Sequence, residues 1–144
     1  MDAIRPFLAL LGRFCICAIF LSSGVHKAMD WENTASYMAA KGMPVVPVFL
    51  VGAIVFEVVG GLLVLVGFKA RIGALALVIF LIPTTLIFHN FWAFEEMERQ
   101  MQMIEFLKNL SILGGLLMVV SGGPGGLSLD GRRASASGGS SGVV

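Results

Sequence analysis

Four long apolar segments limit what this chain can fold into. They run from about Pro6 to Val25, Val46 to Phe68, Ile72 to Trp92 and Gln102 to Ser121. A helix of about 20 residues crosses the hydrocarbon core of a bilayer, whereas irregular backbone there leaves polar groups without partners. Only 13% of the 144 residues are charged, about half the share that is usual in soluble domains. The sequence therefore predicts an all-α fold, an integral membrane four-helix bundle.

The connections between the spans indicate one domain with a short additional helix. In residues 30–41, Trp31 and Met38 fall on one helical face, so we expect a short interfacial helix after the first span. A four-helix transmembrane domain is expected over residues 1–130. Residues 131–144 become rich in Ser, Gly and Ala, which predicts a flexible C-terminal tail.

The basic residues between the spans favour one orientation. An even number of spans places both termini on the same side of the membrane. That side carries five Lys or Arg residues and the other carries three, namely Arg5, Lys69, Arg71, Arg132 and Arg133 against Lys27, Lys41 and Arg99. Cytoplasmic loops carry the excess of Lys and Arg in membrane proteins. Both termini are therefore expected in the cytoplasm.

Two ionisable residues lie deep inside the first two spans. Arg13 is about 12 residues, or ~18 Å, from the outer end of the first span, and Glu57 is about 11 residues, or ~17 Å, from that of the second. We expect them to face each other across the bundle, because an unpaired buried charge is costly. The alternative is that Arg13 reaches toward the headgroups and Glu57 is protonated.

The fourth span includes polar residues by necessity. Its uninterrupted apolar stretch, Leu110 to Val120, covers only about 11 residues or ~17 Å of the ~30 Å core. The span must therefore take in Glu105, Lys108 and Asn109. Glu105 and Lys108 are three residues apart, so they either neutralise each other locally or join groups from other helices.

Further polar residues end the first and third spans at the same outer level. Arg13 and Lys27 lie on one helical stripe, and His89 and Trp92 close the third span. Together these positions predict an intramembrane polar cluster of Arg13, Lys27, Glu57, His89, Glu105, Lys108 and Asn109. His89 and Trp92 are candidates for contact with a cofactor.

Two classes of function find no support in the residues. His26, His89 and Glu105 have ligand-type side chains, but their spacing matches no metal-binding motif, so no metal site is predicted. The net charge of +1 provides no basic surface for nucleic acid.

Several short motifs occur in an order and spacing that resembles the DoxX family over about residues 5–130. They are Gly12-Arg13, Ser23-Gly24-x-x-Lys27, Gly42-x-Pro44, Glu57-x-x-Gly60-Gly61, Gly67-x-x-x-Arg71, His89-x-Phe91-Trp92, Phe106-x-x-Asn109 and Gly123-Pro124-Gly125-x-x-Ser128-Leu129-Asp130. The resemblance implies a four-helix prokaryotic inner-membrane protein. The family is named after a subunit linked to thiosulfate:quinone oxidoreductase or a terminal quinol oxidase.

The leading hypothesis is therefore an accessory or small subunit of a redox membrane system, with a quinone as the cofactor. A quinone head group needs hydrogen-bond donors beside an apolar slot that lipid can reach, and Lys27, His89, Asn109 and Trp92 could supply such a mouth. The alternatives are a non-catalytic assembly subunit of a larger membrane complex and, third, a small-solute or proton pathway. The expected partners are the lipid bilayer and other membrane or redox subunits. The residues leave open whether the chain is itself catalytic.

Overall fold

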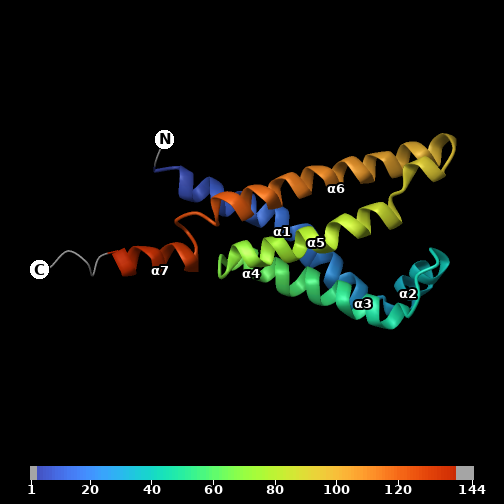
Figure 1. Cartoon of the computed structure of the whole chain (residues 1–144), viewed down its shortest axis with the longest axis horizontal. Coiled ribbons are helices and arrows are strands. Elements are labelled where there is room, and N and C mark those ends of the chain that lie inside the picture. Colours follow the sequence, from blue (N-terminus) through green and yellow to red (C-terminus); the bar gives the residue numbers. More distant parts are fainter. Residues whose placement is uncertain (1–2, 139–144) are drawn as a thin grey trace, which may run out of the picture.

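The computed structural model describes residues 3–138, and every regular element in that part of the chain is a helix (Figure 1). In chain order these are α1 (Arg5–Met29), α2 (Trp31–Ala40), α3 (Val46–Val55), the π-helix η1 (Phe56–Gly60), α4 (Gly61–Val66), α5 (Ala70–Phe88), the 3₁₀-helix η2 (Phe91–Ala93), α6 (Glu96–Gly122) and α7 (Leu129–Gly138). α3, η1 and α4 are continuous and form one span.

Within residues 3–138, four helical stretches are long and apolar enough to cross a membrane. They are 5–29, 46–66, 70–93 and 96–122. Large apolar side chains such as Phe7, Phe14 and Ile79 are more than half exposed, as expected where lipid covers the surface. The prediction of an all-α membrane bundle is confirmed, and so is the short helix after the first span, which is α2.

The spans form two pairs that join at one end and separate at the other. α1 packs against α3, η1 and α4, and α5 packs against α6 and also against α4 and η1, where the two pairs join. The shared core includes Cys17, Val64, Leu77 and Leu116, all fully buried. Toward α2 and η2 the α5–α6 pair diverges from α1 and α3 (Figure 1). We call this the α2 end. The opening between the two pairs lies there.

Glycine allows the closest approach between the pairs. A Cβ added at Gly73 on α5 would lie 2.7 Å from Leu63 Cβ and 3.1 Å from the Gly60 carbonyl oxygen. Real Cβ atoms essentially never come within 3.0 Å of another heavy atom, so a larger residue at Gly73 would force Leu63 and the helix that carries it to shift.

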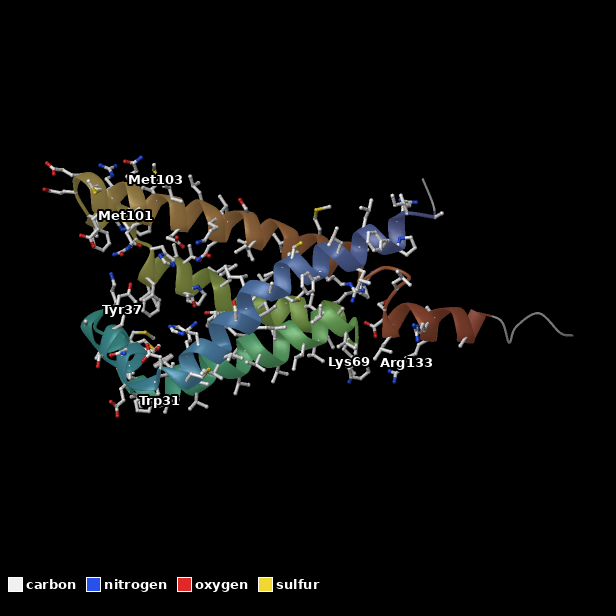
Figure 2. The ribbon with its side chains drawn as sticks, turned by 180° about the vertical axis from the view of Figure 1, so that it is seen from behind. Trp31, Tyr37, Lys69, Met101, Met103 and Arg133 are labelled. Atoms are coloured by element: carbon white, nitrogen blue, oxygen red, sulfur yellow. The ribbon has the colours of Figure 1, made fainter. Side chains whose placement is uncertain are left out.

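The opposite end of the bundle, the basic end, carries Lys69, Arg71, Arg132 and Arg133. Figure 2 shows Lys69 and Arg133 there, with Trp31, Tyr37, Met101 and Met103 at the α2 end. α1 begins at the basic end, where α7 also lies (Figure 1).

Asp130 attaches α7 to the turn between α4 and α5. Its carboxylate accepts hydrogen bonds from the backbone N–H groups of Lys69 at 2.9 Å and Ala70 at 3.0 Å. The N–H of Asp130 donates to the Gly67 carbonyl at 2.9 Å. The bond from Ala70, with that from Lys69, holds the pKa of Asp130 below its ordinary value.

The described part of the expected flexible tail has regular structure. Residues 131–138 belong to α7, and the flexibility of this tail relative to the bundle stays a prediction. Residues 139–144 lie outside the described part of the chain, and the domain boundary at residue 130 stays a prediction.

Candidate functional site

A pocket of about 530 Å³ lies between the two helix pairs, in the half of the bundle nearer the α2 end. Residues of α1, α2, η1 and α3 line one wall, and residues of α5 and α6 line the other. Most of the lining is apolar and includes the aromatic side chains Phe20, Tyr37, Phe49, Phe56, Phe80 and Phe88. Polar side chains interrupt this lining at a few positions only, which is the usual composition of a small-molecule site.

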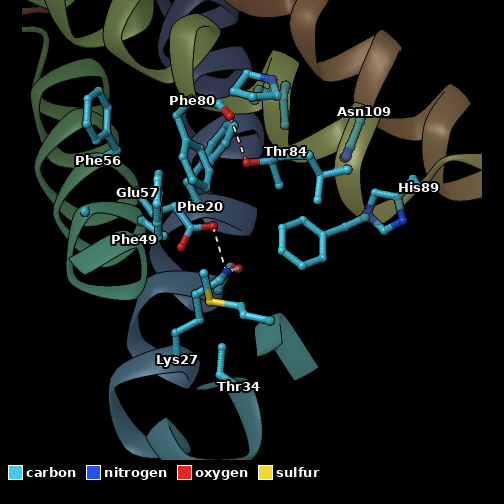
Figure 3. Close-up of a pocket in the computed structure, with 18 of the residues that line it drawn as sticks. Phe20, Lys27, Thr34, Phe49, Phe56, Glu57, Phe80, Thr84, His89 and Asn109 are labelled. Atoms are coloured by element: carbon cyan, nitrogen blue, oxygen red, sulfur yellow. Dashed lines mark hydrogen bonds and ion pairs between the residues drawn. The ribbon is translucent and has the colours of Figure 1, made fainter. Parts of the chain in front are cut away.

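The first polar group is an ion pair between α1 and η1. Lys27 Nζ lies 3.0 Å from Glu57 Oε1, and Lys27 also donates to the Ser23 hydroxyl. Only 6% of the Glu57 side chain is exposed. Gly24 lets the helices approach, since a Cβ there would lie 3.3 Å from Glu57 Cβ. Figure 3 shows the Glu57 carboxylate directed toward Lys27 at the inside of the pocket.

The backbone around Glu57 departs from α geometry. Phe56–Gly60 form a π-helix inside an otherwise α-helical span. Such insertions are rare and occur frequently at functional sites. Glu57 itself belongs to this insertion, which the spacing of the sequence does not indicate.

The second polar group belongs to α5 and α6. Asn109 Nδ2 donates to Thr85 Oγ1 at 3.1 Å, and that hydroxyl donates to the Leu81 carbonyl. Thr84 donates in the same way to the Phe80 carbonyl. These bonds satisfy side-chain hydroxyls beside Pro83, which lies inside α5 and has no N–H of its own. Asn109 and Thr84 face Glu57 across the pocket (Figure 3).

His89, Glu105 and Lys108 line the outer rim of the pocket. His89 Nδ1 lies 3.0 Å from Gln102 Oε1. Lys108 Nζ lies 2.6 Å from Glu105 Oε2, and both side chains are nearly half exposed. Of the two alternatives for this pair, the local ion pair is confirmed.

Arg13 lies away from the pocket, so its expected pairing with Glu57 is wrong. Its guanidinium donates to the carbonyls of Val64 at 3.1 Å and Leu65 at 2.7 Å, and to that of Leu127. These acceptors are at the basic end, where α4 ends and its last carbonyls lack helical partners. The ends of the apolar runs were poor markers of depth, because α1 continues to Met29 and the start of α3 lies beside α2.

Trp92 is also absent from the pocket lining. Its ring makes edge contacts with Phe91 and Phe106, at centroid distances of 5.3 Å and 6.1 Å. Of the seven expected cluster residues, the pocket brings together six and leaves out Arg13. Sequence reasoning missed Ser23, Tyr37 and Thr84. The spacing of Ser23 and Lys27 at i, i+4 was a usable signal for the first of them.

The pocket opens between α3 and α5 toward the lipid-facing surface. Val48, Phe49 and Ile79 line it and are also 65%, 49% and 59% exposed. Phe56 and Phe80 stack at a centroid distance of 6.2 Å and join the two helix pairs beside this opening. Near the α2 end, Tyr37 stacks on Phe88 at 5.6 Å and joins them again. A hydrophobic molecule dissolved in the bilayer therefore has a lateral route to the polar groups.

Comparison with known proteins assigns the chain to a family. The family model described as DoxX matches residues 8–90. The inner membrane proteins YphA and YqjF of Escherichia coli are each 35% identical to the chain over 130 residues. Each match covers 90% of this chain. The matches cover 93% of the length of YphA and 95% of the length of YqjF.

A eukaryotic relative is longer. The ER-derived vesicles protein ERV29 of Saccharomyces cerevisiae is 31% identical over 132 residues, which cover 92% of this chain and 36% of that protein. No solved structure matches the chain. The family model matches more than half of the chain, and the two Escherichia coli relatives align with it over nearly their whole length. The chain therefore belongs to the DoxX family of membrane proteins.

Proposed function

We propose that the chain is an inner-membrane accessory subunit of a redox system and that the pocket between the helix pairs binds a quinone-type head group. The observation that carries this proposal is the pocket itself. It has about 530 Å³ of space, an aromatic lining and a lateral opening. Sites for small organic ligands usually measure about 300–1,000 Å³ and combine apolar walls with a few polar groups.

The chemistry of the lining suits a flat ring with two polar oxygens at opposite edges. Phe20, Phe56 and Phe80 offer faces against which a ring can stack. Lys27 on one wall and Asn109 on the other offer N–H donors. An isoprenoid tail could leave through the opening beside Phe49 and remain in lipid.

The location follows from two further observations. Both Escherichia coli relatives are named inner membrane proteins. The basic end carries the larger share of Lys and Arg outside the spans, which supports a cytoplasmic position for that end and for both termini. The pocket then lies in the half of the bilayer away from the cytoplasm. The redox assignment rests on the family resemblance, since the family's namesake is a subunit of quinone-linked oxidases.

The test uses the full chain in lipid nanodiscs and an azido-benzoquinone photoprobe. Saturable labelling is expected on peptides that line the pocket, and an excess of unlabelled short-tailed benzoquinone should compete with it. Gly52 lines the pocket, and a Cβ there meets nothing within 4 Å. A side chain can therefore start at this position without a clash at its Cβ, and a leucine there would take up space beside the pocket, so Gly52→Leu is expected to reduce labelling at least tenfold.

Gly114→Leu is the matched control. Gly114 also has nothing within 4 Å of an added Cβ, but it lies on α6 outside the pocket. This variant should keep labelling at the level of the natural sequence. Labelling that does not saturate, or that falls equally in both variants, would remove the support for a quinone site here.

A further inference from the structure

A second pocket, of about 550 Å³, lies at the basic end of the bundle, and we call it the basic-end pocket. It lies between the start of α5 and the turn that joins α6 to α7. Lys69, Arg71 and Ile72 line it on the α5 side, and residues 122–126 and the first turns of α7 line it on the other. Among the described residues, it shares no lining residue with the pocket between the helix pairs. It is therefore a separate candidate site.

Cations surround the basic-end pocket. Lys69 and Arg71 line it, and their side chains are exposed. Arg132 and Arg133 follow on α7 and are also exposed, and Figure 2 shows Lys69 and Arg133 together at this end. In the described lining the acidic side chain is that of Asp130, and both of its carboxylate oxygens accept backbone N–H groups at the start of α5. The positive charge that remains suits an anionic ligand.

The Arg71 guanidinium is held in place and stays accessible. Its Nη2 donates to the Ser121 carbonyl at 3.2 Å, at the end of α6. A Cβ at Gly123 would lie 3.5 Å from Arg71 Nε and 3.6 Å from Nη2, so a side chain there would lie against the guanidinium. Gly123 has a φ of +80°, which favours glycine. The turn therefore leaves this face of the guanidinium open, and the planar guanidinium group binds phosphate oxygens well.

The basic-end pocket borders the lipid-facing surface. Ile72 lines the pocket and is 62% exposed. Leu75 and Ile79 follow on the same face of α5 and are 48% and 59% exposed. An exposed apolar stripe thus runs from the pocket along α5 into the membrane-spanning part of the helix. A free phosphate ion makes no contact with such a stripe, whereas the acyl chains of a phospholipid would lie against it.

We propose that the basic-end pocket binds the headgroup of an anionic phospholipid. Arg71 and Lys69 contact the phosphate oxygens, and the acyl chains follow the stripe that begins at Ile72. Basic pockets between membrane helices on the cytoplasmic side bind anionic headgroups, and the basic end is the end proposed above to face the cytoplasm. The inference goes beyond the proposed quinone site and does not depend on it, because the two pockets are separate.

The experiment measures lipid binding to the full chain in a non-ionic detergent by native mass spectrometry. The two lipid probes are phosphatidylglycerol and phosphatidylcholine with identical acyl chains, and inorganic phosphate is the competitor. Each Lys or Arg near an anionic headgroup contributes about fivefold in affinity. Phosphatidylglycerol should therefore bind at least about tenfold more tightly than phosphatidylcholine. An equal concentration of inorganic phosphate should not displace it, because phosphate has no acyl chains.

Two variants and a control locate the site. Arg71→Gln and Lys69→Gln should each weaken the binding of phosphatidylglycerol at least about fivefold. Arg99→Gln is the matched control, since Arg99 is an exposed basic residue at the α2 end, and it should leave the affinity within about twofold. If Arg71→Gln does not fold, Lys69→Gln still tests the proposal. The Lys69 ammonium lies 5.8 Å from the centroid of the Phe68 ring, near the outer limit of a cation–π contact.

Three results would overturn the proposal. Affinities for the two lipids within about threefold of each other would show that the headgroup charge is not recognised. Displacement of phosphatidylglycerol by an equal concentration of inorganic phosphate would show a phosphate site without a role for the acyl chains. Equal losses in Lys69→Gln and Arg99→Gln would mean that the net charge of the protein, and not the basic-end pocket, determines binding.

Discussion

Lys27 and Glu57 are 30 residues apart in sequence, and their Nζ and Oε1 atoms lie 3.0 Å apart across the contact between α1 and η1. The pair is the buried ionic contact of the pocket, whereas Glu105 and Lys108 form a rim pair that water or headgroups can reach. The two pairs give a matched comparison of buried and exposed ionic contacts within one protein.

Replacing Lys27 by methionine is expected to destabilise the fold by about 3 kcal/mol, because it leaves the buried Glu57 carboxylate without its counter-charge. Lys108→Met should cost less than about 1 kcal/mol, as exposed pairs contribute little. Unfolding by SDS in mixed micelles, followed by circular dichroism, measures both. Equal losses in the two variants would mean that burial of the Lys27 pair has no energetic consequence.

Arg13→Met is expected to destabilise the basic end by at least about 3 kcal/mol, because three carbonyl acceptors lose a charged donor. Arg13→Lys keeps the charge but not the planar fork that reaches several acceptors at once, so it should recover only part of the loss. Thermal unfolding in detergent measures the stability of the natural sequence and of the two variants and so shows their order. A methionine variant as stable as the natural sequence would contradict the role assigned to Arg13.

Gly73→Ala is expected to cost about 1–3 kcal/mol, because its methyl group would meet the Leu63 side chain and the Gly60 backbone. Gly114→Ala is the control, since a methyl group there meets nothing within 4 Å. It should be neutral or slightly stabilising, because alanine favours the helix. The same micelle unfolding assay distinguishes them, and a neutral Gly73→Ala would show that α5 and η1 are not in tight contact.

Asp130 predicts a pH dependence at the basic end. Its folded-state pKa is lowered, chiefly by the hydrogen bond from the Ala70 N–H. The contribution of its carboxylate is therefore complete above the unfolded pKa of about 3.9 and is lost as the pH falls through the folded value. Asp130→Asn should be less stable than the natural sequence at pH 7, and the difference should shrink as the pH falls below the unfolded pKa.

Unfolding at several pH values provides the measurement, with Asp30→Asn as the control. Asp30 is an acid at the other end of the bundle and accepts a hydrogen bond from the neighbouring Asn33 side chain. A stability difference for Asp130→Asn that does not change with pH would contradict the assigned cause.

The spans and the short helix α2 could be predicted because each depends on local information. A run of apolar residues is sufficient to identify a membrane helix, whatever its neighbours are. The local ion pair of Glu105 and Lys108, one of the two alternatives for these residues, also depends on local information. Residues three positions apart on one helix have neighbouring side chains. Glu57 was identified as a candidate from its cost in lipid. Lys27 and His89 were identified from their place at the outer ends of two spans, and Asn109 from the length that the fourth span needs.

The partner of Glu57 could not be predicted, because it depends on the register between two helices. Apolar runs define where a helix can span but not how far it slides past its neighbour, and the close approach at Gly24 sets that position. The π-helix at Phe56–Gly60 is a second tertiary effect without a local sequence signal. As a result Lys27, and not Arg13, lies opposite the Glu57 carboxylate.

The bonds of Arg13 have a consequence for biosynthesis. The guanidinium binds carbonyls 51 and 52 positions later and a third that is 114 positions later. The α1 helix thus obtains the last acceptor of its guanidinium only when residue 127 has been translated. Until then the coordination of this cation is incomplete, so the surroundings of α1 cannot reach their final structure one helix at a time.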